Sequence, residues 1–552
     1  MNQPRAFLVA TVAVGVVGGA WLTWLWHASS APPVSPPAVR DVAFAAAVAP
    51  KSAPRTQAAV ADVATPALHP LLAALRQALA RGDARPREAV LTFKDDAALR
   101  RFLERAAAGG LTILGQVDRL RAVRVRFDGV SAWQRELSEN ASDYADLGAN
   151  NLVRVPTPPS KEQRAALDQV PFGNDTLAFM GATGDRTSWG RGTMIAVLDT
   201  GVAADPTFGL GRVRPLDLGF GPAPDPANFK ENGHGTAVAA LAAGANNDAR
   251  GVSPAANILS IRVTDATGTS DLFTISQAIV AAVDAGAKIV NISLGGSTTG
   301  SVLDAALAYA TQQGAVIVAA AGNDQAAQLA WPAADPRVVS VGAVDKAEQQ
   351  VSFSNSGAQL QLTAPGYGVQ TAWLDGQRVY VDGTSASAPL VAGAIAALMS
   401  ANPSLTARQA ADILVRTAND TGAPGADPAY GRGTVNLATA MNAGNLSYVD
   451  TAVSSHYYDA ASNQMQFVVQ NRSGRTVSGM ALNVTAAGSA QTLAVPSLAP
   501  GETYVAKVPV NDIALRAAGS IAFTTQLSNP AGVVDQVPAN NRRASVLTPP
   551  KP

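Results

Sequence analysis

The chain has 552 residues, and its 41 lysine and arginine residues balance 41 aspartate and glutamate residues. A chain of this length contains several domains rather than a single core, and the balanced charge, with no long run of one sign, argues against nucleic acid as a partner. Cysteine is absent, which excludes thiol nucleophiles, thiolate metal sites and disulfide bonds.

An uncharged apolar run over residues 6–26 lies near the start of the chain. It is long enough to span a bilayer and longer than the core of an ordinary signal peptide. The small residues Ala28 and Ser30 leave a cleaved signal as the alternative, although nearby prolines disfavour it. We therefore assign residues 1–30 to a transmembrane anchor or a signal peptide and expect an exported protein, either a membrane-anchored precursor or a secreted protein.

Two segments of different character follow. Residues 31–66 are rich in Ala, Pro and Val, which is typical of an extended linker. Residues 67–160 have the mixed pattern of a small α+β domain with two helices. The strands are expected at residues 89–94, 121–127 and 151–155, and the helices around Phe102 and Trp133.

Residues 170–444 are rich in Ala, Gly and Val and alternate apolar strands with helical segments. The expected strands read TMIAVLDT, NILSIRV, AKIVNISL, GAVIVAAAG and RVVSVGAV. Because each strand is apolar almost throughout, helices should cover both faces of the sheet. The pattern predicts an α/β domain with a doubly wound, mostly parallel sheet, in which ligands bind at the carboxyl ends of the strands.

Residues 447–549 lack this helical periodicity. They contain short β-rich segments separated by turns such as RSGR and APGE. The pattern predicts an all-β sandwich as the C-terminal domain.

Polar residues mark three turns of the α/β domain. Asp199 ends the strand MIAVLD, Asn323 ends VIVAAAGN, and Ser385 stands where a Gly-Thr turn leads into a long helix of small residues. A serine at a helix N-terminus is often only a capping residue. Its hydroxyl becomes a nucleophile when a base accepts the proton and a third group orients that base. Asp199 suits the role of orienting group, and the amide of Asn323 suits that of a donor to an oxyanion.

Histidine is scarce in this chain, and no two histidines form an HExxH-type pair for zinc. The four are His27, His69, His234 and His456. His234 lies in the segment GHGTAVAAL and is the only histidine of residues 170–444. A lone histidine beside glycines is more often structural than catalytic. If an imidazole activates Ser385, however, that imidazole belongs to His234.

Four segments in a fixed order, VLDTGV, NGHGTAVA, AAAGN and DGTSASAPLVAG, resemble the signature of the subtilisin-like serine proteases. The resemblance extends over residues 170–444 and includes GVSPAANILSIRV, NISLGG and YGRGTVNLATA. It implies a serine endopeptidase that cleaves proteins or peptides through an acyl-enzyme intermediate and needs no cofactor for its chemistry. The roles it implies are Asp199 as orienting group, His234 as general base and acid, Ser385 as nucleophile and Asn323 as oxyanion donor.

The resemblance also implies where a substrate binds. The residues that match the strand pairing with the substrate backbone are Ser293, Leu294 and Gly295. Those that match a wall of the pocket for the residue before the scissile bond are Ala319, Ala320, Ala321 and Gly322. Ala330 matches the position that helps to set the depth of this pocket, and its methyl group predicts a preference for small to medium apolar side chains.

The chain departs from the family pattern at three places. Ala237 stands where a second histidine is frequent and Ala386 where methionine is common, but neither position transfers protons, so the expected activity is retained. Residues 243–252, AGANNDARGV, match a calcium-binding region of the family but are shortened. A structural calcium ion is compatible with the resemblance, while its oxygen ligands do not follow from it.

Residues 67–160 resemble the inhibitory propeptide of the family, an intramolecular partner whose C-terminal tail occupies the active site before self-cleavage. The segment QVPFG, which starts at Gln169, resembles the beginning of a mature enzyme. We therefore expect cleavage between Thr157 and Gln169. Because the predicted anchor lies on the propeptide side of that cleavage, processing would release the protease from the membrane unless the propeptide stays bound.

Residues 447–549 resemble the bacterial cell-adhesion-related (CARDB) domains through VVQNRSG, PSLAPGET and VPANNRR. A binding role and a passive stabilising role both fit this resemblance.

Two rival hypotheses concern the whole chain. The motif DTG also marks aspartic proteases, but these need a second such unit on β-rich lobes. A catalytically silent surface-binding protein on a protease scaffold is the other rival, and the complete set of catalytic residues disfavours it.

Overall fold

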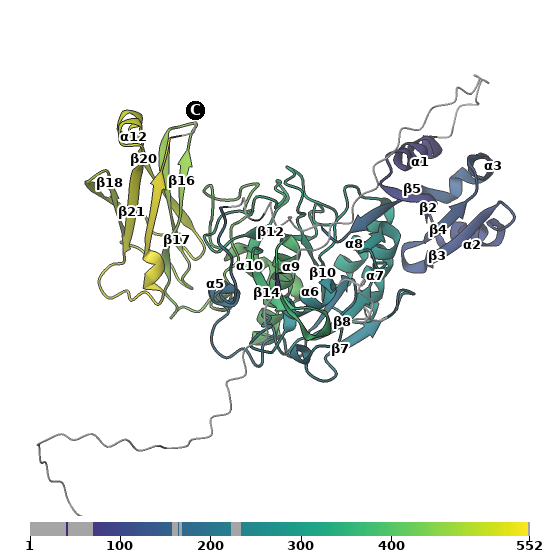
Figure 1. Cartoon of the computed structure of the whole chain (residues 1–552), viewed down its shortest axis with the longest axis horizontal. Coiled ribbons are helices and arrows are strands. Elements are labelled where there is room, and N and C mark those ends of the chain that lie inside the picture. The colour runs from purple at the N-terminus through teal and green to yellow at the C-terminus, as the bar shows by residue number, and fades with distance from the viewer. Residues whose placement is uncertain (1–39, 42–69, 157–163, 165–167, 222–232, 550–552) are drawn as a thin grey trace, which may run out of the picture. The chain divides into compact units, whose positions relative to one another are not determined.

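The computed structural model describes residues 40–41, 70–156, 164, 168–221 and 233–549, and Figure 1 shows their elements in chain order. The predicted anchor or signal peptide, most of the predicted linker, and His27 and His69 lie outside these residues. The 3₁₀ turns are η1 (Asp118–Leu120), η2 (Ala141–Asp143), η3 (Pro206–Phe208), η4 (Leu374–Gly376) and η5 (Pro538–Asn541).

A seven-stranded parallel sheet forms the centre of the α/β domain (Figure 1). In spatial order its strands are β13 (Leu362–Pro365), β12 (Val339–Val344), β11 (Val316–Ala320), β10 (Ile289–Ile292), β6 (Met194–Asp199), β8 (Asn257–Arg262) and β7 (Val213–Leu216). The first of these in sequence, β6, lies inside the sheet, with later strands on both sides of it. The strand order therefore reverses beside β6, which is where open α/β sheets bind ligands.

Helices cover both faces of this sheet. They are α5 (Thr176–Phe179), α6 (His234–Ala243), α7 (Leu272–Asp284), α8 (Ser301–Gln312), α9 (Thr384–Ala401), α10 (Ala407–Arg416) and α11 (Leu437–Met441). Ile195 and Val197 of β6 belong to the same core as α6 and α9, whereas Ala196 and Leu198 belong to the core of α7 and α8. Because successive strand side chains point to opposite faces, the apolar strands are buried on both sides. The predicted doubly wound fold class is confirmed.

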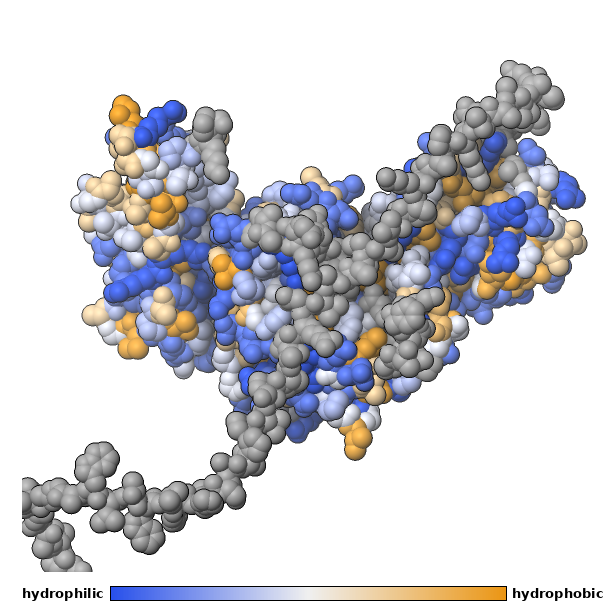
Figure 2. Space-filling view, in the orientation of Figure 1, coloured by the Kyte–Doolittle hydropathy of each residue, from blue (hydrophilic) through white to orange (hydrophobic). Residues whose placement is uncertain are grey.

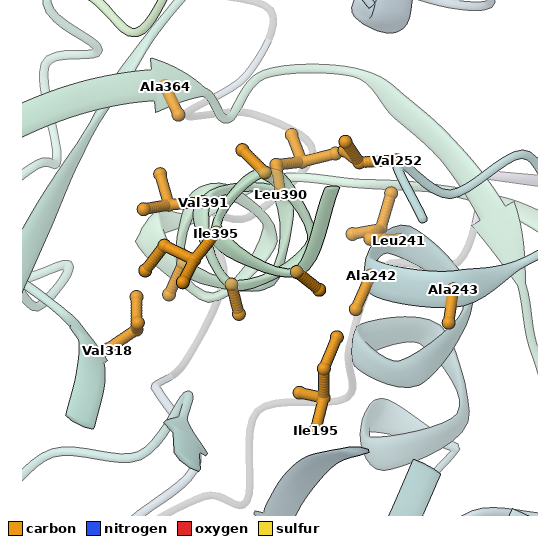
Figure 3. Close-up of a cluster of buried hydrophobic side chains, with 14 of the residues drawn as sticks. Ile195, Leu241, Ala242, Ala243, Val252, Val318, Ala364, Leu390, Val391 and Ile395 are labelled. Atoms are coloured by element: carbon orange, nitrogen blue, oxygen red, sulfur yellow. The ribbon is translucent and has the colours of Figure 1, made fainter. Parts of the chain in front are cut away.

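Helix α9 is a long, deeply buried helix of this core. Figure 3 shows Val391 and Ile395 of α9 among side chains from α6 and from the strands. A Cβ atom at Gly393 would lie 2.7 Å from the carbonyl oxygen of Ala242, so α6 and α9 approach this closely because residue 393 is glycine. Among the described helices, α9 alone is long and apolar enough to cross a membrane, but 83% of it is buried inside the protein. It is a core helix.

A second, antiparallel sheet contains most of residues 67–160. Its strands in spatial order are β3 (Leu111–Val117), β4 (Ala122–Phe127), β2 (Ala84–Phe93), β5 (Tyr144–Arg154) and β9 (Thr269–Asp271), and its helices are α1 (Pro70–Ala80), α2 (Asp96–Arg105) and α3 (Val130–Asn140). The expectation of two helices is wrong, because α1 precedes the others. Its first residue is Pro70, a position where the missing N–H of proline costs nothing. Strand β9 comes from the α/β domain and joins the sheet beside β5.

The C-terminal region folds as two sheets around one core. One sheet contains β16 (Thr451–Asp459), β17 (Gln464–Asn471) and β20 (Thr503–Pro509), and the other β19 (Ser489–Ala494), β18 (Ala481–Ala486), β21 (Ile521–Ser528) and β22 (Arg542–Leu547). The expectation of an all-β domain needs one correction, since the short helix α12 (Asp512–Ala518) connects β20 to β21. Asn511 caps this helix by accepting from the N–H of Ala514.

A small three-stranded sheet includes the two strands that precede α9 in sequence, β14 (Val369–Ala372) and β15 (Arg378–Val381). Its third strand is β1 (Arg40–Asp41), which pairs with β15. On the face shown in Figure 2, hydrophilic residues cover most of the described surface and hydrophobic residues are scattered among them. The largest exposed apolar side chains, including Leu210, Leu446 and Ile513, belong to separate segments of the chain.

The close packing of α9 gives a test of the fold. Replacing Ile395, which is fully buried, by alanine should lower the free energy of unfolding of the α/β domain by about 2–5 kcal/mol, because a cavity replaces buried methylene groups. Urea denaturation followed by circular dichroism measures this loss. The matched control is Ile513→Ala at a position that is 82% exposed, which should change stability by less than about 0.5 kcal/mol. Equal effects of the two variants would contradict the packing described.

Candidate active site

Three strand ends meet at the carboxyl edge of the seven-stranded sheet. Asp199 is the last residue of β6, Ser293 follows β10 directly, and Asn323 lies just beyond β11. Strand β10 is hydrogen-bonded to β6 on one side and to β11 on the other. The parallel sheet therefore brings these residues to one edge although they are far apart in sequence.

Asp199 and His234 are in direct contact and both are buried. The Oδ1 atom of Asp199 lies 2.8 Å from Nδ1 of His234, and Asp199 is 0% exposed. The same oxygen accepts a hydrogen bond of 2.7 Å from the backbone N–H of Thr200. A carboxylate accepts the hydrogen of Nδ1–H, which places the basic lone pair of the imidazole on its second ring nitrogen.

The start of helix α6 is held tightly against the turn after β6. The Thr200 hydroxyl accepts from the N–H of Gly235 at 2.9 Å. A Cβ atom at Gly235 would lie 2.4 Å from the carbonyl oxygen of Gly201, so only glycine permits this approach. Gly235 thus has a structural reason, which is to bring the imidazole of His234 to Asp199.

Ser385 and His234 both lie at the start of a helix, at the carboxyl edge of the sheet. Helices α6 and α9 both begin at the carboxyl edge of the sheet, where His234 contacts Asp199 and Thr384 contacts Asn323. Gly393 of α9 lies against Ala242 of α6, and the two are equally far along their helices from Ser385 and His234. The two residues therefore stand at the starts of adjacent, parallel helices.

The Ser385 hydroxyl donates to the backbone carbonyl of Ser293 at 3.3 Å. Within the described part of the chain it makes no hydrogen bond to His234, so the predicted serine–imidazole bond is not formed in this arrangement. Catalytic hydrogen bonds are often long or absent before a substrate binds, and a rotation about the Cα–Cβ bond of serine redirects its hydroxyl.

Pro389 accounts for a second contact between Ser385 and Ser293. Pro389 lies inside α9 and has no N–H, so it cannot complete the helical hydrogen bond to the carbonyl of Ser385. That carbonyl accepts instead from the hydroxyl of Ser293 at 3.1 Å, and the Asn291 amide donates to the Ser293 hydroxyl at 3.0 Å. Ser293 and Asn291 therefore fix the first turn of α9 in place.

The amide of Asn323 is oriented by Thr384. Its Oδ1 accepts from both the N–H and the hydroxyl of Thr384, at 3.0 and 2.8 Å. Because the oxygen is engaged in this way, the orientation of the NH₂ group is fixed on the opposite side. A Cβ atom at Gly383 would lie 2.7 Å from Nδ2 of Asn323, so this nitrogen is close to the turn that leads into Ser385. The N–H groups of the first turn of α9 lie at the positive end of the helix.

A cavity of about 490 Å³ lies next to this turn and contains three of the predicted substrate-binding residues, Gly295, Gly322 and Ala330. A Cβ atom would lie 2.9 Å from the Ala330 methyl if placed at Gly295, and 2.3 Å from the Asn355 amide nitrogen if placed at Gly322. Both glycines therefore keep the cavity open.

The other predicted substrate-binding side chains do not line this cavity. Those of Leu294, Ala319, Ala320 and Ala321 are buried in the two cores, and that of Ser293 is buried against the first turn of α9. Any contact of these residues with a substrate would be through the main chain.

Residues 154–156, at the end of β5, lie against the same edge. Arg154, the last residue of β5, pairs with Gly295 in both directions, through hydrogen bonds of 2.9 and 3.0 Å. The N–H of Val155 donates to the carbonyl of Gly268 at 2.9 Å, and Pro156 lines the cavity described above. The end of β5 thus lies between two segments of the α/β domain as an added strand.

Sequence reasoning missed Thr384, Asn291 and Arg154. Thr384 and Asn291 are polar residues in apolar surroundings beside recognised motifs, and that signal was available. No pattern in the sequence indicated Arg154, because its pairing with Gly295 is a contact between distant segments.

Among the described residues, the polar groups outside this site do not form a second catalytic or metal-binding site. Both ring nitrogens of His456 are engaged, by the Ser545 and Thr525 hydroxyls at 2.8 Å each, and burial lowers the pKa of this histidine to about 3. His456 is therefore a neutral, structural residue of the sandwich. The described residues contain no group of three or more His, Cys, Asp or Glu side chains that could hold a metal ion.

Comparisons with known proteins agree with this geometry. The profile of the Subtilase family matches residues 190–433. Subtilisin Savinase from Lederbergia lenta is 34% identical over 49% of this chain and 98% of its own sequence. An alkaline protease from Shouchella clausii is 30% identical over 64% of this chain and 90% of its own sequence.

Solved structures agree at the level of the fold. The crystal structure of fervidolysin from Fervidobacterium pennivorans, a keratinolytic enzyme related to subtilisin, has a TM-score of 0.55 at 20% identity and covers 85% of this chain and 76% of that one. The epidermin leader peptide processing serine protease from Staphylococcus aureus has a TM-score of 0.53 at 21% identity and covers 65% of this chain and 98% of that one. The chain belongs to the subtilase family and is a serine endopeptidase.

Proposed function

We propose that Asp199, His234 and Ser385 act together as a catalytic triad. The observation that carries this proposal is the buried 2.8 Å contact between Asp199 and His234, in a helix that starts beside the helix of Ser385. His234 accepts the Ser385 proton as the hydroxyl attacks a peptide carbonyl, and then donates it to the leaving amine. Water hydrolyses the resulting acyl-enzyme with His234 again as base. Asp199 holds the ring and stabilises its protonated form.

Asn323 is proposed to stabilise the tetrahedral intermediate. Thr384 occupies the oxygen of its side-chain amide, which supports an orientation in which the NH₂ group donates to the developing oxyanion. The backbone N–H of Ser385, at the positive end of α9, is the second proposed donor. Donors of this kind act most strongly in the transition state, when negative charge has formed on the oxygen.

The substrate is proposed to bind as an extended strand along Gly295, with the residue before the scissile bond in the cavity beside Gly322 and Ala330. The pairing of Arg154 with Gly295 supports this, because it is the backbone pattern that a bound peptide would use. The Ala330 methyl lies against both glycine positions, which favours small to medium apolar side chains in the cavity.

Residues 67–160 are proposed to be an inhibitory propeptide in a self-processing zymogen. The end of β5 lies along the proposed substrate-binding edge, which supports a tail that blocks access until it is cleaved. Cleavage between Thr157 and Gln169 would separate the protease from an N-terminal segment that directs export and anchors the precursor. For the C-terminal sandwich, CARDB-like on its sequence, we propose a role in binding surfaces or substrates.

The nucleophile can be tested with an organofluorophosphonate probe, which reacts with activated serines. Purified wild-type protein should be labelled at Ser385, and Ser385→Ala should abolish labelling because no other group provides the hydroxyl. Mass spectrometry of the labelled peptide identifies the site. Ser404→Ala, at an exposed serine of the same domain, is the matched control and should label fully. A folded wild-type protein that does not label would favour the silent binding scaffold instead.

The oxyanion role predicts a specific kinetic effect. Asn323→Ala should lower kcat about 10²–10³-fold with little change in KM, because the lost donor acts mainly in the transition state. Steady-state kinetics on a peptide substrate measure both constants. Asn445→Ala, at an exposed asparagine remote from the site, should leave them unchanged. A rise in KM at constant kcat would instead assign Asn323 to ground-state binding.

Self-processing predicts a defined new N-terminus. Expression of the full chain should yield a mature form that starts within the segment between Thr157 and Gln169, whereas Ser385→Ala should remain uncleaved because it lacks the nucleophile. N-terminal sequencing identifies the start. The mature form should also leave the membrane fraction after a high-salt wash. Retention of a fragment starting near Gln169 in washed membranes would contradict the proposed release.

A further inference from the structure

The loop after helix α6 matches a calcium-binding region of the family but is shortened. It covers residues 243–252, and an ion there would need oxygen atoms that are not already bound by protein donors. The structure allows a direct test of that requirement, because the partners of the loop oxygens are known.

Many oxygens of this loop accept hydrogen bonds from protein donors. The pairs are Gly244 O with Gly251 N at 2.8 Å, Asn246 O with Ala249 N at 3.1 Å, Ala249 O with the Thr207 hydroxyl at 2.9 Å, Asp248 O with the Gln370 side chain at 3.3 Å, and Asn247 Oδ1 with the Arg250 guanidinium at 2.8 Å. The backbone bond between Gly244 and Gly251 closes the loop on itself. A Cβ atom at Gly244 would lie 2.1 Å from the carbonyl oxygen of Ala249, so the loop packs this closely only with glycine at residue 244.

A guanidinium group occupies the space between the nearby carboxylates. Arg378 binds Asp205 through two nitrogens, at 2.9 and 3.3 Å, and its Nε lies 3.1 Å from Oδ2 of Asp248. The carbonyls of Gly376 and Gln377 accept from the same group at 3.1 Å each. The side chains of Arg378 and Asp205 are 5% and 0% exposed, whereas that of Asp248 is 44% exposed. A cation prefers such oxygen-rich surroundings, and the guanidinium of Arg378 is the cation that occupies them here.

We propose that Arg378 takes the place of a metal cation at this site, so that residues 243–252 bind no calcium. A buried carboxylate needs a positive partner, and a planar guanidinium can bind two carboxylates and two carbonyls at once. The donor set around the loop therefore does not fit a calcium ion while Arg378 is present.

The position of Arg378 links the three catalytic segments. Asp205 lies in the turn that follows Asp199, Asp248 lies in the loop that follows the helix of His234, and Arg378 begins β15, which leads to Ser385. One side chain thus cross-links the chain segments that carry the proposed triad. In a metal-dependent site an ion and its ligands would perform this task, and the stability of the link would depend on calcium concentration.

The experiment uses the full chain in the Ser385→Ala background, so that self-cleavage does not affect it and its outcome is independent of the proposed catalysis. Equilibrium dialysis with calcium should give the same number of bound ions for Ser385→Ala alone and for the same protein with Asp205→Asn. In thermal unfolding, the difference in Tm between calcium and chelator should also be the same for both.

A second set of variants tests the guanidinium itself. Arg378→Gln should lower Tm by roughly 5–15 °C with or without calcium, because it leaves a buried carboxylate without a partner. Arg408→Gln, which removes a half-exposed arginine paired with Asp412, is the matched control and should shift Tm by less than about 2 °C. If Arg378→Gln does not fold, Asp248→Asn keeps the buried pair and should bind as much calcium as its parent.

The proposal is overturned if Asp205→Asn or Asp248→Asn binds one calcium ion fewer than the parent. It is equally overturned if the chelator lowers the Tm of the parent but not that of Asp205→Asn. An Arg378→Gln protein as stable as the Arg408→Gln control would also contradict it.

Discussion

The buried carboxylate of Asp199 imposes the main constraint on this structure. It is 0% exposed at the end of a central strand, where an unpaired charge would be strongly destabilising, so its surroundings must supply donors. The N–H of Thr200 and the ring of His234 supply them. For the ring to reach Asp199, helix α6 has to begin against the turn after β6, and this requires glycine at residue 235. The imidazole of His234 is therefore placed where it can donate a hydrogen bond to the buried carboxylate of Asp199.

Buried polar groups around the start of helix α9 are also given hydrogen-bond partners by neighbouring residues. Pro389 leaves the carbonyl of Ser385 without its helical partner, and the Ser293 hydroxyl replaces it. Thr384 uses its backbone and side chain to hold the amide of Asn323. Each polar group near Ser385 is thus positioned by a neighbour that itself has little freedom. Such a preorganised site does not have to rearrange as charge develops.

Charge pairing extends beyond the proposed catalytic residues. Arg378, which is almost fully buried, joins segments that follow Asp199 and His234 to the strand that precedes Ser385. An arginine contributes a fixed positive charge that does not depend on the ion content of the surroundings. The end of β5 adds backbone hydrogen bonds at the substrate-binding edge, so the separate parts of the chain converge on one side of the sheet.

The sequence by itself determined the doubly wound fold and the identity of Asp199, His234, Asn323 and Ser385, because apolar strands and spaced motifs are local patterns. It did not indicate the helices α1 and α12 or the short edge strands β7 and β13. Four-residue strands such as these two carry little periodicity. Only the tertiary structure decided that Ser385 rests on Ser293, that Arg154 pairs with Gly295, and that Arg378 lies between Asp205 and Asp248. These contacts join residues far apart in the chain, and their geometry depends on how whole helices and strands pack.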